Sequence, residues 1–338
     1  MQARRTDLIV FVNGTDISTT VGGYIQSLSY TDNEEDEADD LQITMDDKDR
    51  KWLGWLETAR GAELRAMIRQ RESGGNGGGF LDCGAFELDA PGYGGPPAKV
   101  TLKGTSLPHT SSVRSEARTK AWENVPLSAI AKETAKSNGL VCMFESSYDP
   151  FYTRREQIQT SDIVFLQRLC NNAGISLKAT DKILVLFQQK DYEAKGTVRK
   201  IVYGESDVLK YKFKQQTNDC DYARCHVTYT DPQSGETIES AFSAPGATGN
   251  QTLVVNEKVS STGEAESVAQ ARLRDKNKER QKAEFTLSGD IRLVAGVTVV
   301  VEGWGLFDGK YIIEKAKHSV SGSGYTVQIN VRLVLEGY

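Results

Sequence analysis

The last fifty residues of the chain alternate between apolar and polar positions in the way that β-strands do. In residues 325–335 every second side chain is apolar. The positions between them include Gln328, Asn330 and Arg332. Successive side chains of a strand point to opposite faces, so this segment predicts a strand with one buried face and one polar face. Further strands are predicted at 297–302 and 311–317, and each is followed by a turn of glycines or polar residues.

An earlier stretch repeats this order of strands and turns. A strand predicted at 63–69 is followed by the glycine-rich turn 73–79. The segment Gly84-Ala85-Phe86-Glu87-Leu88 then resembles Gly309-Lys310-Tyr311-Ile312-Ile313 in the later stretch. Both stretches continue into a β-rich run, at 98–103 and at 325–331. We interpret the two stretches as one β unit that is used twice in the chain.

The remaining segments predict three regions. Residues 1–108 are expected to be all-β, with a short helix at 48–56. Residues 109–195 are expected to form a small αβ module behind a polar connector. Residues 196–338 are β-rich again, with a helical excursion at about 245–282. The strands predicted in the first region are 7–13, 24–32, 40–46, 63–69, 79–88 and 98–103.

Three helices are predicted from the spacing of small and apolar residues. The first spans 126–138, and its inward face is Leu127, Ile130, Ala131, Thr134 and Ala135. The second is capped by Thr160 or Ser161 and ends at Gly174, before a hairpin at 175–187. The third spans 263–282, with Ala265, Val268, Ala269, Ala271 and Leu273 on one face and charged residues on the other.

Composition narrows the class of protein. The 338 residues contain no run of about 18 apolar residues, so no transmembrane helix is expected. The first apolar run is too short for a signal peptide, and the five cysteines are odd in number and scattered, as in a protein made in the cytoplasm. The net charge of −5 argues against a nucleic-acid partner, because phosphate binding needs a basic face.

Several stretches resemble the late control protein D family, which comprises baseplate hub proteins of contractile phage tails and tail-like particles. The stretch Gln159-Thr160-Ser161-Asp162-Ile163-Val164-Phe165-Leu166-Gln167-Arg168-Leu169, with Gly174 after it, carries the clearest similarity. Residues 38–47 and the charged helix leading into 285–290 resemble the same family. So do residues 293–296 together with 309–313 and His318-Ser319. The similarity runs in order along essentially the whole chain.

The resemblance implies a fold and an assembly. The fold would be mainly β, with two tube-like antiparallel β-barrels per chain, a small αβ module and an outer helix. Three chains would form a ring of six barrels that adapts a sixfold tail tube to a threefold central spike. The implied partners are two further copies, the tail tube protein, the spike protein and a baseplate wedge or LysM-type protein. Catalytic, cofactor-binding and metal-binding residues are not expected, nor are specific nucleic-acid binding or membrane insertion.

The particle would be assembled in a bacterial cytoplasm, and it is either a virion or a tail-like bacteriocin. The inward face of the ring is expected to be polar. We expect acidic residues on that face, because they would repel passing DNA and prevent it from sticking.

The residue types that usually carry chemistry do not form a site in the sequence. The histidines are His109, His226 and His318. His318 and Ser319 are neighbours on a strand and would point to opposite faces. Cys220, Cys225 and His226 lack a fourth zinc ligand, so buried cysteines and a strand histidine are the simpler interpretation.

The charged and glycine-rich segments are expected to be structural elements without a chemical role. The acidic segment 34–49 lacks the register of a calcium loop and is expected to be a solvated loop. Asp46 and Asp47 would diverge on a strand, which does not suit paired glycosidase acids. The glycine run 74–79 has no Gly-Lys-Ser/Thr after it and predicts a mobile hairpin tip. The helix at 264–282 interleaves acids with its bases and lacks aromatics, so it is expected to be an exposed structural helix.

An alternative function stays open at this point. The chain could be a cell-wall-directed protein of a tail tip, either a carbohydrate-binding module or a peptidoglycan hydrolase, acting through the αβ module. Carbohydrate binding would need exposed aromatic platforms, for which the candidates are Trp122, Tyr148, Phe151 and Tyr152.

Overall fold

The computed structural model is mostly β and describes most of the chain. The described residues are 5–35, 37–59, 61–71, 78–89, 91–106, 116–180, 182–216, 218–232, 234–246 and 250–338. The predictions for His109, for residues 74–77 and for most of the connector 109–118 concern residues outside this part of the chain. No described helix is long and apolar enough to cross a membrane.

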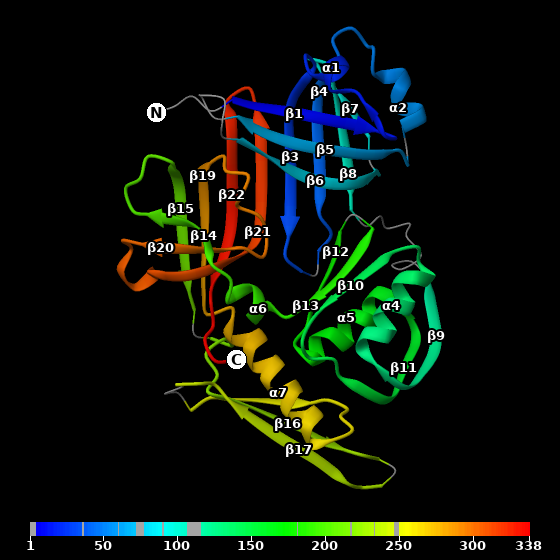
Figure 1. The fold of residues 1–338 in the computed structure, drawn as a ribbon, viewed down its shortest axis with the longest axis vertical. Coiled ribbons are helices and arrows are strands. Elements are labelled where there is room, and N and C mark those ends of the chain that lie inside the picture. Colours follow the sequence, from blue (N-terminus) through cyan, green and yellow to red (C-terminus); the bar gives the residue numbers. More distant parts are fainter. Residues whose placement is uncertain are drawn as a thin grey trace.

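The first β unit occupies the N-terminal hundred residues. Its main strands are β1 (Arg5–Val12), β3 (Ile25–Asn33), β4 (Asp40–Asp46), β5 (Glu63–Arg71), β6 (Gly78–Leu88) and β8 (Lys99–Thr105). The smaller elements are β2 (Thr15–Asp16), α1 (Ser18–Val21), α2 (Leu53–Ala59) and β7 (Gly92–Gly94). The sheet order is β3-β4-β8-β6-β5-β1, and β1 and β5 cross in front of β3, β4 and β8 (Figure 1). Leu28, Ile43, Phe86 and Val100 are buried between these layers.

The second β unit repeats this strand order. Its strands are β14 (Thr197–Val202), β15 (Val208–Gln215), β19 (Gln281–Ser288), β20 (Thr298–Glu302), β21 (Gly309–Ser321) and β22 (Gly324–Leu333), with the 3-10 turn η1 (Gly305–Phe307). The pairing order is β15-β19-β22-β21-β20-β14. If the six main strands of each unit are numbered 1 to 6 along the chain, both units have the strand order 2-3-6-5-4-1. One strand differs in direction, since β1 is antiparallel to β5 whereas β14 is parallel to β20.

The shared order confirms the predicted repeat at the level of strands but not residue by residue. Gly84 lies within β6 at a positive φ of 89°, where the pairing with β5 shifts register. Gly309, which the sequence comparison placed opposite Gly84, is instead the first residue of β21.

The two units are joined edge to edge into one sheet. Residues 315–321 of β21 pair antiparallel with residues 27–33 of β3. As a result, eight strands follow one another in the order β15-β19-β22-β21-β3-β4-β8-β7. Among the described strands, no ladder joins β1 to β3 or β14 to β15.

The αβ module lies between the two units in sequence and beside them in space (Figure 1). It contains β9 (Ala117–Pro126), α4 (Leu127–Ser137), β10 (Val141–Glu145), β11 (Phe151–Ser161), α5 (Asp162–Ala173), β12 (Ser176–Thr180), β13 (Ile183–Phe187) and α6 (Gln189–Glu193). The predicted inward face of α4 is buried, and α5 ends at Gly174 in the left-handed conformation. The paired strands β9 and β11 were not predicted, because their exposed faces are charged and hide the apolar alternation.

The excursion in the second unit is larger than predicted. Residues 216–280 leave the sheet between β15 and β19 and hold β16 (Arg224–Thr230), β17 (Thr237–Ser243), β18 (Thr252–Asn256) and α7 (Thr262–Asn277). The strands β16 and β17 therefore lie outside the second β unit, although the sequence predicted one β-rich region over 196–338. They form a separate sheet whose apolar face packs on α7, around Cys225, Val268 and Leu273. The division into three domains stays a proposal, and this separate core favours a fourth unit, which we call the insertion.

Candidate functional site

The eight-stranded sheet has one apolar face and one polar face, and both run across the joint between the units. One row of paired residues on the polar face is Lys210, Thr286, Gln328, Lys317, Thr31, Asp40 and Thr105. The next row points to the core and consists of Leu287, Val327, His318, Tyr30, Leu41 and Gly104. Residues directly opposite each other share a face, so the alternation stays in phase over both units.

The polar face is basic, although the whole chain is acidic. At its paired positions it carries eight lysines and three acidic residues, with serine, threonine, asparagine and glutamine between them. Glu314, in the bulge of β21, also reaches this face and pairs with Lys282. The lysines are Lys99, Lys103, Lys210, Lys212, Lys214, Lys282, Lys315 and Lys317. The acidic residues at the paired positions are Asp40, Asp46 and Glu284. The expectation of acidic residues concerns the inward face of the assembled ring, so it stays a prediction for that assembly.

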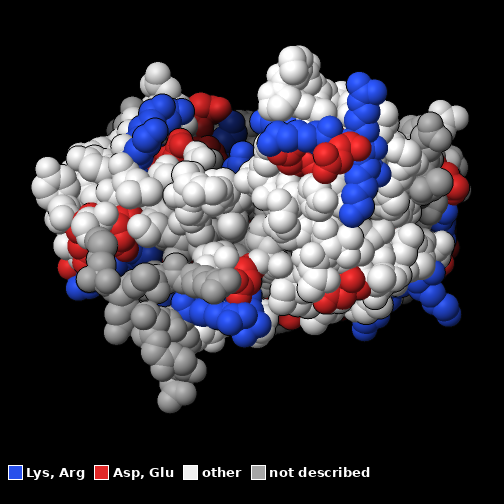
Figure 2. All heavy atoms as spheres, turned by 90° about the horizontal axis from the view of Figure 1, so that it is seen from above, with Lys and Arg blue, Asp and Glu red and all other residues white. Residues whose placement is uncertain are grey.

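The charge of the sheet differs from that of the end of the molecule shown in Figure 2. The end of the molecule shown in Figure 2 is mostly uncharged, and its basic and acidic side chains lie beside one another. On the sheet, only two of the eight lysines have a recorded acidic partner among the described residues. Lys282 pairs with Glu279 and Glu314, and Lys315 pairs with Glu37.

The two ends of the eight-stranded sheet have open edges. Among the described strands, β15 pairs only with β19, and β7 pairs only with β8. Leu209 and Tyr211 on β15 are about half exposed, at 50% and 48%, and Tyr93 on β7 is 42% exposed. An open strand edge with apolar side chains is ready to pair with another strand.

A buried charged junction connects the first β unit to the αβ module. The Nζ of Lys178 on β12 lies 2.5 Å from Oδ1 of Asp32 and 3.6 Å from Oδ1 of Asp39. Thr180 donates to Oδ2 of Asp39 at 2.7 Å, and the backbone N–H of Ala295 donates to Asp32 at 2.9 Å. Burial raises the pKa of Asp39 to about 6, with Lys178 opposing the shift.

A second part of the junction surrounds Arg332 of β22. This side chain is fully buried, and its Nη1 lies 2.5 Å from Oε1 of Glu193 in α6. Its Nε lies 3.5 Å from Oε1 of Glu314, and its Nη2 donates to Gln189 at 3.1 Å. Arg274 of α7 also pairs with Glu193, at 2.6 Å. The alternation placed Arg332 on the polar face correctly, but α6 covers that end of the face.

The turn between β3 and β4 brings its acids into the same junction. Glu35 accepts from Lys278 at 2.9 Å and from Gln189 at 2.7 Å. Burial favours the neutral form of Glu35, but the charges of Lys278 and Arg332 and the hydrogen bonds from Ser176 and Lys278 together outweigh it and lower the pKa. Burial raises the pKa of Glu34 to about 8, against the opposing effect of Arg332. Arg332 and Arg274 are already balanced by Glu193 and Glu314, so a further charge on Glu34 is unfavourable.

Two expectations about charged segments are therefore wrong. The acidic segment was expected to be solvated, yet Glu34, Asp39 and Asp47 are at most 3% exposed. The helix α7 was expected to be an exposed structural helix, yet its charged side connects three regions. Arg274 reaches α6, Lys278 just beyond the helix reaches the first β unit, and Glu264 pairs with Arg155 of the αβ module. The helix was correctly predicted to bury its small face.

The residues considered for catalysis or metal binding are dispersed. His318 is buried, its Nδ1 lies 2.7 Å from the hydroxyl of Tyr325, and its Nε2 lies 3.0 Å from the carbonyl of Leu293. Burial lowers its pKa to about 4. Cys225 is buried in the core of the insertion, whereas His226 lies on the other face of β16, 3.4 Å from Glu239. No group of three His, Cys, Asp or Glu residues in the described ranges is arranged to hold a metal ion.

The aromatic residues of the alternative function do not form a platform. Trp122 and Tyr152 are buried in the core of the αβ module, and Tyr148 packs against that core and bonds to Ser267. Phe151 is exposed at 63% but stands apart from the others. Asp47 is buried and accepts from the backbone N–H of Trp52, whereas Asp46 pairs with Lys48, so these acids do not face a common substrate.

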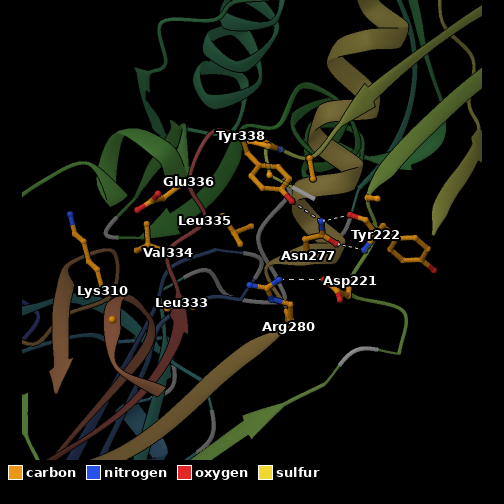
Figure 3. A pocket seen from close by; sticks show the side chains of 15 residues that line it. Asp221, Tyr222, Asn277, Arg280, Lys310, Leu333, Val334, Leu335, Glu336 and Tyr338 are labelled. Carbon is orange, nitrogen blue, oxygen red and sulfur yellow. Dashed lines mark hydrogen bonds and ion pairs between the residues drawn. The ribbon is translucent and has the colours of Figure 1, made fainter. Parts of the chain in front are cut away.

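A groove of about 520 Å³ lies between the insertion and the last residues of the chain (Figure 3). Its polar groups largely bond to one another. Asn277 donates to the hydroxyl of Tyr338 at 2.7 Å, and Arg280 pairs with Asp221 at 3.3 Å. Lys310, on the opposite wall, donates to the carbonyl of Lys195. The groove is thus a joint between the insertion and the second β unit.

Comparison with known proteins connects this architecture to phage tails. The chain is 32% identical over 178 residues to a protein named probable baseplate hub protein from Escherichia phage 186. It is 29% identical over 215 residues to the protein of the same name from Escherichia phage P2. The chain is related to phage baseplate hub proteins. These alignments cover 52% and 61% of this chain, and the chain spans only about half the length of these relatives, 43% and 52%.

Solved structures and a family model add to this relationship. A family model described as YQBQ-like matches residues 250–332. The fold is similar to that of a prophage MuSo2 tail protein from Shewanella oneidensis, with a TM-score of 0.74, 15% identity and coverage of 97% and 98% of the two chains. An Escherichia coli component of the type VI secretion system matches with a TM-score of 0.58 and 13% identity, over 93% of this chain and 75% of that one. The resemblance inferred from the motifs is confirmed.

Proposed function

We propose that this chain is a structural baseplate hub, in which three copies form a ring of six similar β units between a tail tube and a central spike. The observation that carries the proposal is the shared strand order of the two units and their edge-to-edge joint through β3 and β21. A chain with two equivalent units, repeated about a threefold axis, matches a sixfold tube. The names of the curated relatives support the hub role.

The open edges supply a way to close the ring. β15 is the second strand of its unit, as β3 is of the first. β7 pairs with β8, the last strand of the first unit, in the same way that the end of β21 pairs with β22, the last strand of the second unit. The other edge of β7 is open among the described strands. In the proposed ring, β15 of one copy lies against β7 of the next copy, as β3 lies against β21 within a chain. Head-to-tail contacts of this kind close into a ring and leave no edge exposed.

The proposed partners follow from this role. They are the tail tube protein, the central spike protein and a baseplate wedge or LysM-type protein, in the baseplate of a virion or tail-like particle. The type VI secretion component is described as similar to the bacteriophage T4 tail proteins gp27 and gp5, which supports a partner of the spike kind. We propose no enzymatic role. The burial of Trp122 and Tyr152 weighs against the cell-wall-directed alternative.

The ring contact is tested by placing charges on its two edges. We expect Leu209→Asp and Tyr93→Asp each to shift the assembly from trimer to monomer in size-exclusion chromatography with light scattering, because a buried unpaired carboxylate opposes strand pairing. Both side chains are exposed within one chain, so folding should change by less than about 1 kcal/mol. Val254→Asp, on the 66% exposed Val254 of the insertion, is the matched control and should stay trimeric. A wild-type chain that is monomeric at every concentration would contradict the proposal.

A further inference from the structure

We propose that the polar face of the eight-stranded sheet binds the phosphate backbone of double-stranded DNA without reading its sequence. This inference goes beyond the hub role and does not depend on ring closure, because the face is complete within one chain. The face consists of lysine, hydroxyl and amide side chains, and the strand pairing gathers the positive charge of the lysines on it.

The charge balance of the face differs from that of the chain. The chain has a net charge of −5, whereas the paired positions of the face hold eight lysines and three acidic residues, to which the bulge of β21 adds Glu314. One of these acids, Glu284, accepts from Gln328 at 2.5 Å within the face. Lys103, Lys210, Lys212, Lys214 and Lys317 are exposed, and no acidic partner is recorded for them within the described ranges. A surface of this kind attracts a polyanion, and its attraction weakens with salt.

The kinds of side chain suit contacts to phosphates without readout of bases. Lysine, serine, threonine, asparagine and glutamine are the residues that contact DNA phosphates and sugars without sequence information. Arginine binds phosphates too, and it is also the residue that makes bidentate hydrogen bonds to guanine edges. The one arginine on the described part of this face is Arg332, which α6 buries. The paired positions on the face also lack the aromatic rings on which single-stranded bases stack.

The arrangement favours an extended ligand. The lysines lie on β8, β15, β19 and β21, so they span both units instead of forming one cluster. Hydroxyl and amide side chains fill the positions between them, as in the pairs Ser29–Gln42 and Gln328–Lys317. A rod of regularly spaced negative charge satisfies such a face better than a compact anion does.

The test measures binding of the full chain to a fluorescent mixed-sequence duplex of about 30 base pairs, as a function of salt. The variant Lys103→Gln/Lys212→Gln/Lys317→Gln removes three exposed lysines of the face. It should bind at least about tenfold more weakly at low salt, and its slope of log affinity against log salt should fall by about 3. A duplex of different base composition should bind equally well.

The control variant is Lys132→Gln/Lys136→Gln/Lys190→Gln, which removes three exposed lysines of α4 and α6. It should change the affinity by less than about twofold. If the triple face variant does not fold, Lys212→Gln and Lys317→Gln tested singly should each lower the salt slope by about 1.

Three results would overturn the inference. The first is that the wild-type chain does not bind the duplex at low salt. The second is that the face variant and the control variant lose equal amounts of affinity. The third is that polyglutamate displaces the duplex at a lower concentration of charge than unlabelled duplex does. The last result would make an acidic polypeptide the partner. Light scattering on the same samples tests the hub proposal separately. A chain that forms the trimer but does not bind DNA would contradict the DNA inference and leave the hub proposal standing.

Discussion

The two β units share a strand order but differ in what connects their second and third strands. In the first unit, the six residues 34–39 connect β3 to β4. In the second unit, residues 216–280 connect β15 to β19 and hold the whole insertion. The short acidic connection 34–39 contacts the long connection 216–280, because Glu35 accepts a hydrogen bond from Lys278 just beyond α7. The repeated sheet thus supplies the symmetry of the molecule, and the connections between its strands supply the asymmetry that fixes the attached regions.

The largest expected effect comes from removing the buried arginine of this junction. Arg332→Ala should lower the free energy of unfolding by about 3–5 kcal/mol, because it takes a buried cation from Glu193 and from Glu314 and leaves each carboxylate with one other cationic partner. Urea denaturation measures the change. Arg154→Ala removes an arginine that is 59% exposed and pairs with Glu123, so it should cost less than about 1 kcal/mol. Equal losses in the two variants would show that the junction does not stabilise the molecule.

A smaller effect is expected where the first unit meets the αβ module. Lys178→Ala should cost about 2–3 kcal/mol at pH 7, because Asp32 and Asp39 then face each other while buried. The pKa of Asp39 is already raised to about 6, and losing Lys178 should raise it further. Protonation should therefore restore part of the lost stability at pH 5. Lys200→Ala, which removes a 57% exposed partner of Glu302, is the control and should show no such recovery.

The smallest effect distinguishes the acids within the connection itself. The pKa of Glu34 is raised to about 8 in the folded chain, from the ordinary value of 4.5 for a glutamate. The unfolded chain therefore releases this proton first, and the stability associated with Glu34 is present below pH 4.5 and is lost as the pH rises through 8. Glu34→Gln cannot ionise, so its stability relative to wild type should increase by about 2 kcal/mol between pH 5 and pH 6.5. A constant difference across this range would show that Glu34 is ionised in the folded chain.

Much of the fold could be predicted because it depends on local patterns. The buried face of α4, the left-handed end of α5 at Gly174 and the small face of α7 all follow from neighbouring residues. The burial of the acidic connection could not be predicted in this way. Lys178 lies 146 positions from Asp32, and Lys278 lies 243 positions from Glu35. A run of acids without nearby bases looks solvated until the fold brings distant cations to it.

The charge of the sheet was hidden for a related reason. Alternation predicts that Lys317, Thr31 and Thr105 point away from the core of their own strands. It does not show that these residues lie in one row, because that depends on β21 pairing with β3 and on β4 pairing with both β3 and β8. The insertion was also missed, since β16 and β17 alternate like the strands of the sheet from which they are excluded.

The symmetry and mass of the isolated assembly test the central claim most directly. Electron microscopy of the purified particle, viewed end-on, should show a threefold ring of six similar β units, with β15 of each chain paired to β7 of the next. Light scattering should give three times the 37.2 kDa mass of one chain. A ring in which the two units of a chain occupy dissimilar positions, or an assembly that leaves β15 and β7 unpaired, would contradict it.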